Sequence, residues 1–171
     1  ELQLSRTSNA RAYNNLLIGR QHFYLFYNKE ENRKAREFFQ LATQLDPDFA
    51  LAYWGEAMTY NHPIWGEYDG EAGRAALARY RGTPSSDREA LYLEALDPLY
   101  LRGTRDKTER DRAYMEAMRQ VAGEYDAECI EIDRMLADRP DVYTDHCHFN
   151  AEGHRLIAEA VARFLVEHKM I

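Results

Sequence analysis

The chain has 171 residues and a mass of 20.0 kDa, which is the size of one domain or of one domain with a short appendage. Hydrophobic residues make up 45% and charged residues 30%, so the chain is able to bury a core and is not a disordered tail. The net charge of -7 disfavours nucleic acid as a partner, because binding a phosphate backbone needs a concentrated positive surface. No apolar run approaches the ~18 residues of a membrane span, and no apolar leader is visible. We therefore expect a soluble protein that does not bind membranes, in a compartment that the sequence does not indicate.

Helical periodicity dominates the chain. Apolar residues recur at helical spacing in segments that are separated by turns with Pro, Gly or capping residues, and these segments are 9–27, 31–45, 47–60, 69–80, 86–96, 108–123 and 151–168. Ser86 stands three residues before Glu89, as in a capping box, and Thr108 is the expected cap of the next helix. The only strand candidate is the alternating segment 128–132. We predict an all-α or nearly all-α fold of antiparallel helix pairs, with about six or seven helices and at most one short strand.

Residues 35–60 carry small and aromatic residues at the spacing of a tetratricopeptide repeat: Ala35, Phe39, Ala42, Asp46, Pro47, Tyr53, Ala57 and Tyr60. In that pattern the small residues lie where two helices cross closely, and the aromatic residues fill the gaps between successive pairs. Residues 12–125 therefore resemble a tetratricopeptide-type helical array, and the resemblance implies a module that binds a protein or peptide. The chain departs from the pattern at Phe23, and the ~34-residue period is lost after Tyr60.

Aromatic residues recur along this array: Tyr24, Tyr27, Tyr53, Trp54, Tyr60 and Trp65. One interpretation is packing between helices, because aromatic residues at helical spacing commonly fill a core. In the other interpretation, Tyr24, Tyr27, Tyr53 and Tyr60 line a concave groove that grips a peptide or a partner helix. The sequence does not identify the partner.

The C-terminal block 144–158 contains an Asp and a His, separated by two residues, directly before the last predicted helix. This block resembles the last conserved block of SGNH (GDSL-type) esterases and lipases, and a weaker likeness extends over about residues 108–168. The resemblance implies that Asp145 orients His148 and that His148 takes the proton of a nucleophile.

The chain lacks the nucleophile and the oxyanion donors that this family requires. Its serines, Ser5, Ser8, Ser85 and Ser86, do not lie in a Gly-Asp-Ser block, and no Gly-x-Asn-Asp stretch is present. We therefore expect a non-catalytic interaction or scaffold module of chimeric character. Residues 1–125 would form the helical array, and residues 126–171 a segment that caps it rather than an independent domain. The alternative is a fragment or descendant of an SGNH-type esterase, whose Asp145–His148 pair serves a nucleophile that this chain does not contain.

The same block is a dense group of potential metal ligands: Asp145, His146, Cys147, His148 and His154. No zinc-finger spacing is present, and the hydrolase-like motif already accounts for these residues, so we expect neither a metal nor another cofactor. Cys129 is expected to be a small buried residue.

Overall fold

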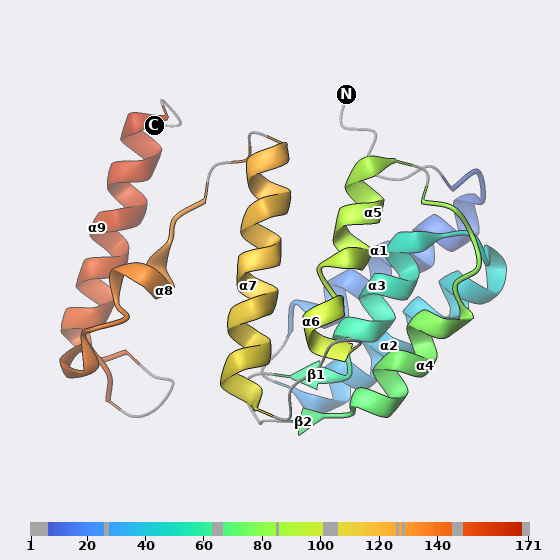
Figure 1. Cartoon of the computed structure of the whole chain (residues 1–171), viewed down its shortest axis with the longest axis horizontal. Helices are drawn as coiled ribbons and strands as arrows, with labels where there is room; N and C mark the ends of the chain where they lie inside the picture. The colour runs from blue at the N-terminus through green and yellow to red at the C-terminus, as the bar shows by residue number, and fades with distance from the viewer. Residues whose placement is uncertain are drawn as a thin grey trace. The chain divides into compact units, whose positions relative to one another are not determined.

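The structure is a computed structural model of the whole chain (Figure 1). It describes residues 7–25, 28–62, 67–84, 86–100, 106–125, 127, 129–144 and 149–168. These residues are mostly helical, which confirms the predicted all-α class. The chain divides into two compact units, Glu1–Tyr125 and Asp126–Ile171. No helix of the described residues is long and apolar enough to cross a bilayer.

Helices account for most of the first unit. They are α1 (Ala10–Phe23), α2 (Lys29–Leu45), α3 (Ala50–Met58), α4 (Gly70–Arg79), α5 (Asp87–Glu94), α6 (Asp97–Tyr100) and α7 (Lys107–Glu124). Two short strands, β1 (Asn61–His62) and β2 (Glu67–Tyr68), pair antiparallel, with Asn61 opposite Tyr68. Every predicted segment of this unit overlaps an observed helix. Ala95 and Leu96 separate α5 from the single turn of α6, which contains Pro98.

Capping side chains set the start of most helices, as their residue types predict. Asn9 begins α1 by accepting hydrogen bonds from the backbone of Arg11 and Ala12, at 3.1 Å each. Ser86 caps α5 through the backbone N–H of Glu89 at 3.3 Å, as expected. The expected cap of α7 is wrong: Asp106, not Thr108, accepts from a backbone N–H of the first turn, so the helix starts earlier.

The first three helices pack as neighbouring antiparallel pairs. At one end of the first pair, the Nδ2 of Asn9 donates to the carbonyl oxygen of Leu45 at 2.8 Å. At the other end, Nδ1 of His22 lies 2.6 Å from Oε2 of Glu31. These contacts join the start of α1 to the end of α2 and the end of α1 to the start of α2.

The pairing of α2 with α3 is fixed by polar groups. The Nδ2 of Asn32 donates to the Thr59 carbonyl oxygen at 3.0 Å, and the Gln40 amide donates to the fully buried Glu56 carboxylate at 3.0 Å. Arg79 of α4 also pairs with Glu56. A buried carboxylate is stable only when such donors surround it, so this group ties α4 to α2 and α3.

The core of these helices is built around one aromatic ring. Phe39 of α2 is 1% exposed, and it packs with Ala12, Leu16, Ala35, Ala42, Phe49 and Ala52. A β-carbon added at Gly19 of α1 or at Gly55 of α3 would lie 2.8 Å from the Phe39 ring. The two glycines therefore let both helices approach the ring more closely than any other residue would allow.

A second hydrophobic cluster joins α3, α4, α6 and α7. Its buried members are Ala57, Leu96, Leu99 and Tyr100, and Tyr114 of α7 packs against them. The Tyr100 hydroxyl donates to the Ala57 carbonyl oxygen at 2.6 Å, and burial raises the pKa of Tyr100. This cluster holds α6 and α7 on the side of the array formed by α3.

The second unit contains α8 (Ile132–Met135), the 3-10 turn η1 (Pro140–Val142) and α9 (Ala151–Glu167). Asn150 caps α9 by accepting from the Gly153 backbone at 3.0 Å, and its Nδ2 donates to the Asp141 carbonyl oxygen at 2.7 Å. Leu136 and Val142 are its buried apolar side chains within the described residues. The predicted docking of the last helix onto the array stays a prediction.

The predicted strand at 128–132 is wrong where the structure describes it. Cys129, Ile130 and Glu131 form no strand, and Ile132 begins α8. The backbone N–H of Met135 donates to the Glu131 carbonyl oxygen at 2.9 Å, so this carbonyl oxygen has its partner within a helical turn and not in a neighbouring strand. Cys129 is exposed, not buried as expected.

Candidate functional site: a groove between α5, α6 and α7

The tyrosines that the sequence suggested for a peptide groove lie in different surroundings. Tyr24 follows α1 and is 62% exposed, and its hydroxyl accepts a hydrogen bond from Arg20 at 2.9 Å. Tyr27 lies outside the described residues. Tyr60 is half-buried, with the Arg36 guanidinium 4.1 Å from its ring centroid.

Tyr53 belongs to the interior of the array. It is 4% exposed, and its ring centroid lies 5.3 Å from that of Tyr80. Burial raises the pKa of Tyr53, and it raises the pKa of Tyr80 to about 12. For Tyr53 this environment is the one expected of a residue that packs between helices. A shared groove of the four tyrosines stays a hypothesis.

The residues of the hydrolase-like motif, Asp145 and His148, lie outside the described residues. The chain on either side of them is described. Tyr143 and Phe149 form an isolated antiparallel bridge, and their ring centroids are 4.8 Å apart. The geometry of the Asp–His pair therefore stays untested.

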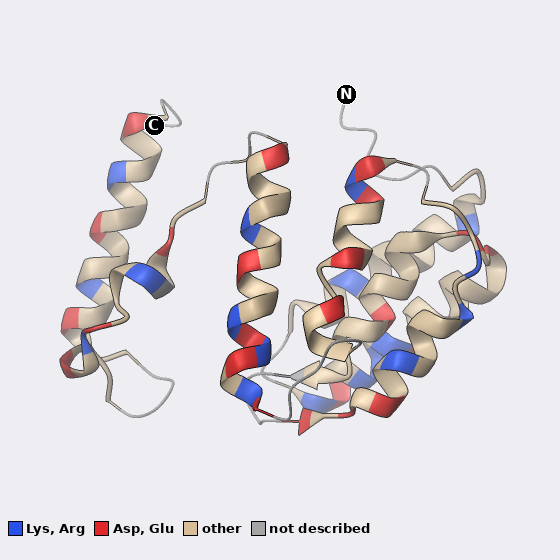
Figure 2. Cartoon of the chain, viewed as in Figure 1, with Lys and Arg blue, Asp and Glu red and all other residues tan. Residues whose placement is uncertain are grey.

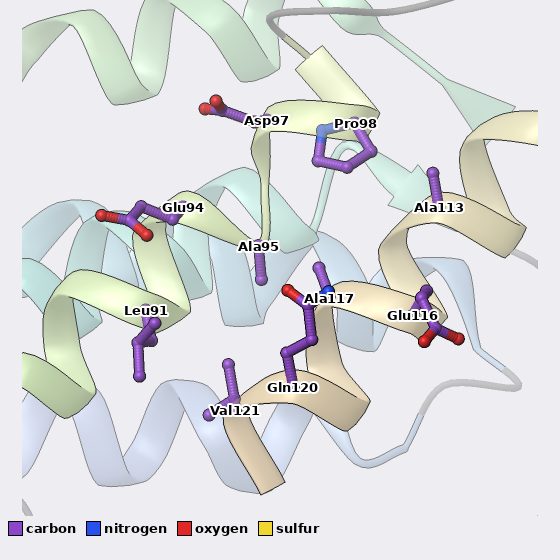
Figure 3. Close-up of a pocket in the computed structure, with 10 residues that line it drawn as sticks. All are labelled: Leu91, Glu94, Ala95, Asp97, Pro98, Ala113, Glu116, Ala117, Gln120 and Val121. Atoms are coloured by element: carbon purple, nitrogen blue, oxygen red, sulfur yellow. The ribbon is translucent and has the colours of Figure 1, made fainter. Parts of the chain in front are cut away.

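A pocket of about 590 Å³ lies between α5 and α6 on one side and α7 on the other (Figure 3). Apolar side chains from all three helices line it: Leu91, Ala95, Pro98, Ala113, Ala117 and Val121. Four polar residues complete the lining: Glu94, Asp97, Glu116 and Gln120. Glu94, Ala113, Glu116 and Gln120 are exposed, so the pocket opens to solvent as a groove.

The spacing of the α7 residues explains why they share one wall. Ala113, Ala117 and Val121 follow one another at four-residue intervals, which places them along one face of a helix. The facing wall has Leu91 of α5 and Ala95, the residue that caps the end of α5, at the same interval. The alanines on both walls are too short to reach across, and the space between the helices therefore remains open.

Cation–aromatic contacts outside the groove attach α7 to the rest of the first unit. The Arg88 guanidinium of α5 lies 5.4 Å from the ring centroid of Tyr125, which ends α7. Near the start of α7, the buried Arg110 guanidinium lies 3.8 Å from the ring centroid of Tyr68. Between these two contacts Tyr114 packs against the Tyr100 cluster, and this burial raises the pKa of Tyr114 to about 12. Both ends of α7 are thus attached to the array, and the groove lies between these attachments.

The lining of the groove includes three acidic residues (Figure 3), and Figure 2 shows acidic positions on α5, α6 and α7. Glu94 and Asp97 come from the wall of α5 and α6, and Glu116 comes from the opposite wall. None of the ten lining residues is Lys or Arg. Arg119 lies 3.2 Å from the Glu116 carboxylate, but the Glu116 side chain is still 53% exposed. The groove therefore combines an apolar floor with carboxylates on both sides.

A smaller pocket of about 250 Å³ lies between the residues that precede α1, the turn between α2 and α3, and the segment around Thr83 and Glu89. Its carboxylates belong to Asp46, Asp48 and Glu89. Asp46 accepts hydrogen bonds from the Thr7 hydroxyl and, at 3.1 Å, from the Asp48 backbone, so it shapes the turn before α3. Among the residues that the structure describes, no group of three His, Cys, Asp or Glu side chains is arranged to hold a metal ion.

Comparison of the chain with protein families, with curated proteins and with solved structures finds no match. The tetratricopeptide-like and hydrolase-like resemblances rest on their motifs. Sequence reasoning missed the groove. The alanine spacing on α7 was the available signal. To predict a groove from it, one must also know which helix faces α7, and spacing within one helix does not give that.

Proposed function

We propose that the chain is a non-catalytic helical module that binds a segment of another protein in the groove between α5, α6 and α7. The observation that carries this proposal is the pocket of about 590 Å³ with an apolar lining. This volume falls in the range of about 300–1,000 Å³ that is usual for binding pockets. Grooves between helices are a common way to receive the apolar side chains of a partner.

The apolar lining is sufficient for a specific but reversible complex. Burying one Leu, Phe or Met side chain contributes about 1.5–3 kcal/mol. Two or three such anchors contribute about 3–9 kcal/mol before the cost of association is subtracted, against the roughly 8 kcal/mol that corresponds to micromolar affinity. We therefore expect dissociation constants that are micromolar or weaker.

The scaffold of the groove favours the same proposal. The Phe39 core and the buried Glu56 network hold the first four helices together, and the Tyr100 cluster attaches α6 and α7 to α3. A groove with walls that are fixed before binding loses less entropy when a partner binds. The tetratricopeptide-like spacing at 35–60 agrees with a role in protein binding.

Selection from a random peptide library displayed on phage, followed by calorimetric titration of a selected peptide, tests the proposal. Ala113→Phe places a large side chain at the groove and is expected to weaken binding at least tenfold. Ala75→Phe is the matched control, because Ala75 is also exposed and helical but lies on α4, outside the lining. Thermal unfolding of both variants controls for stability. Failure to select any peptide, or equal binding by the two variants, would contradict the proposal.

A further inference from the structure

We propose that the segment bound in the groove is an amphipathic helix that carries Lys or Arg on both sides of its apolar anchors. This inference rests on the proposed function and adds the chemistry of the partner. Its basis is the charge of the groove: Glu94 and Asp97 stand on one wall, Glu116 stands on the other, and the lining has no basic residue.

The shape of the groove favours a helix over an extended peptide. From Ala113 to Val121 the α7 wall is eight residue steps long, or about 12 Å at 1.5 Å per step, which is about two turns of a partner helix. Such a helix would present anchors at positions i, i+4 and i+7. An extended peptide would bring unpaired backbone groups against apolar walls, where Gln120 is the one uncharged polar side chain of the lining. A helix satisfies its own backbone groups.

The carboxylates decide the sign of the flanking charges. A basic side chain on each flank of the partner would approach Glu94 on one wall and Glu116 on the other. Charges at the rim of an interface act mainly on association rate and selectivity, and their effect falls with added salt. The net charge of -7 on the whole chain acts in the same direction, because it repels acidic partners and second copies of this chain.

A matched pair of synthetic peptides tests the inference by fluorescence anisotropy on the full chain. Both peptides are helices of about 18 residues with Leu at the anchor positions, and they differ only in flanking Lys or flanking Glu. At about 50 mM salt we expect the Lys peptide to bind at least tenfold more tightly, and at about 0.5 M salt we expect this preference to shrink. A third peptide, with the Lys composition and two central prolines, is expected not to bind.

Charge reversal within the groove provides the variant test. Glu94→Lys with Glu116→Lys is expected to abolish or invert the preference for the Lys peptide. Glu71→Lys is the matched control on the exposed first turn of α4, and it is expected to leave the preference nearly unchanged. Circular dichroism confirms that each variant is folded.

The outcomes separate this inference from the proposed function. If library peptides bind in an Ala113-dependent manner but the Lys and Glu peptides bind equally, the helical module stands and the cationic partner is refuted. If neither synthetic nor library peptides bind, both proposals fail. If sedimentation shows a dimer that Ala113→Phe dissociates, the occupant is a second copy of the chain, and the inference is also overturned.

Discussion

Replacing Gly55 by alanine is expected to destabilise the first unit by about 1–2 kcal/mol. A β-carbon at Gly55 would lie 2.8 Å from Cε1 of Phe39, well inside the 3.5–4.0 Å of an optimal carbon–carbon contact. The ring has little room to withdraw, because it is 1% exposed and α1 approaches it equally closely at Gly19. The added methyl group must therefore displace α2 or α3.

Two opposing effects determine the magnitude. Overpacking a core costs about 1–3 kcal/mol, and we expect about 2–3 kcal/mol here because the ring is confined, whereas replacing glycine by alanine inside a helix contributes about 1 kcal/mol of stability. The steric cost exceeds the gain in helix propensity, because the neighbouring atoms belong to a confined ring rather than to the end of a flexible chain. For a chain of this size the melting temperature is expected to fall by about 2–8 °C.

Gly123→Ala is the control for helix propensity. Gly123 lies in the last turns of α7, and a β-carbon there would meet no atom within 4 Å. We expect this variant to be unchanged or up to about 1 kcal/mol more stable. Urea unfolding followed by circular dichroism gives the free energy of unfolding for both variants.

A double-mutant cycle identifies the cause of the loss. In a Phe39→Leu background the smaller side chain vacates space beside α3, so Gly55→Ala is expected to cost less than in the wild-type chain. If the cost is the same in both backgrounds, the Phe39 ring does not explain the glycine at position 55, and the reasoning is refuted.

Three further predictions concern separate parts of the chain. Ser86→Ala is expected to cost about 1 kcal/mol in urea unfolding, because it removes the side-chain cap of α5, and an unchanged value would refute that role. Burial, followed by the nearby Tyr92, raises the pKa of Tyr114 to about 12, so the folded state favours the neutral phenol. The free energy of unfolding is therefore expected to decline between about pH 10, where the phenol ionises in the unfolded chain, and pH 12. Tyr114→Phe should reduce this decline. No His148-dependent hydrolysis of a short-chain nitrophenyl ester is expected, and a saturable rate that His148→Ala abolishes would favour the esterase alternative.

The helices could be predicted because their signals are local. Asn9 and Ser86 act within three residues of their own positions, and the apolar spacing of each long segment is carried by that segment alone. The error at 128–132 has the opposite origin. Alternation there satisfied a strand pattern, but a strand also requires a partner for its backbone, and Ile132 instead begins a helical turn.

The aromatic residues show why site prediction was harder than helix prediction. Tyr53 and Tyr60 both occur at helical spacing in the same repeat-like segment, yet Tyr53 is 4% exposed and Tyr60 is half-buried under Arg36. The difference depends on which helix passes over each ring. Spacing within one helix does not contain that information, so the two interpretations of these tyrosines could not be separated from the sequence.

Small residues have two opposite consequences in this fold, and the difference bears on function. At Gly19 and Gly55 a missing side chain is compensated by the Phe39 ring, which fills the space and joins three helices. At Ala113 and Ala117 of α7 the side chains stay exposed or partly exposed, and a groove of about 590 Å³ remains beside them. Apolar walls that stay open to water forgo the free energy of burial. Under the proposed function a bound partner covers these walls, and the comparison of Ala113→Phe with its control Ala75→Phe tests that explanation.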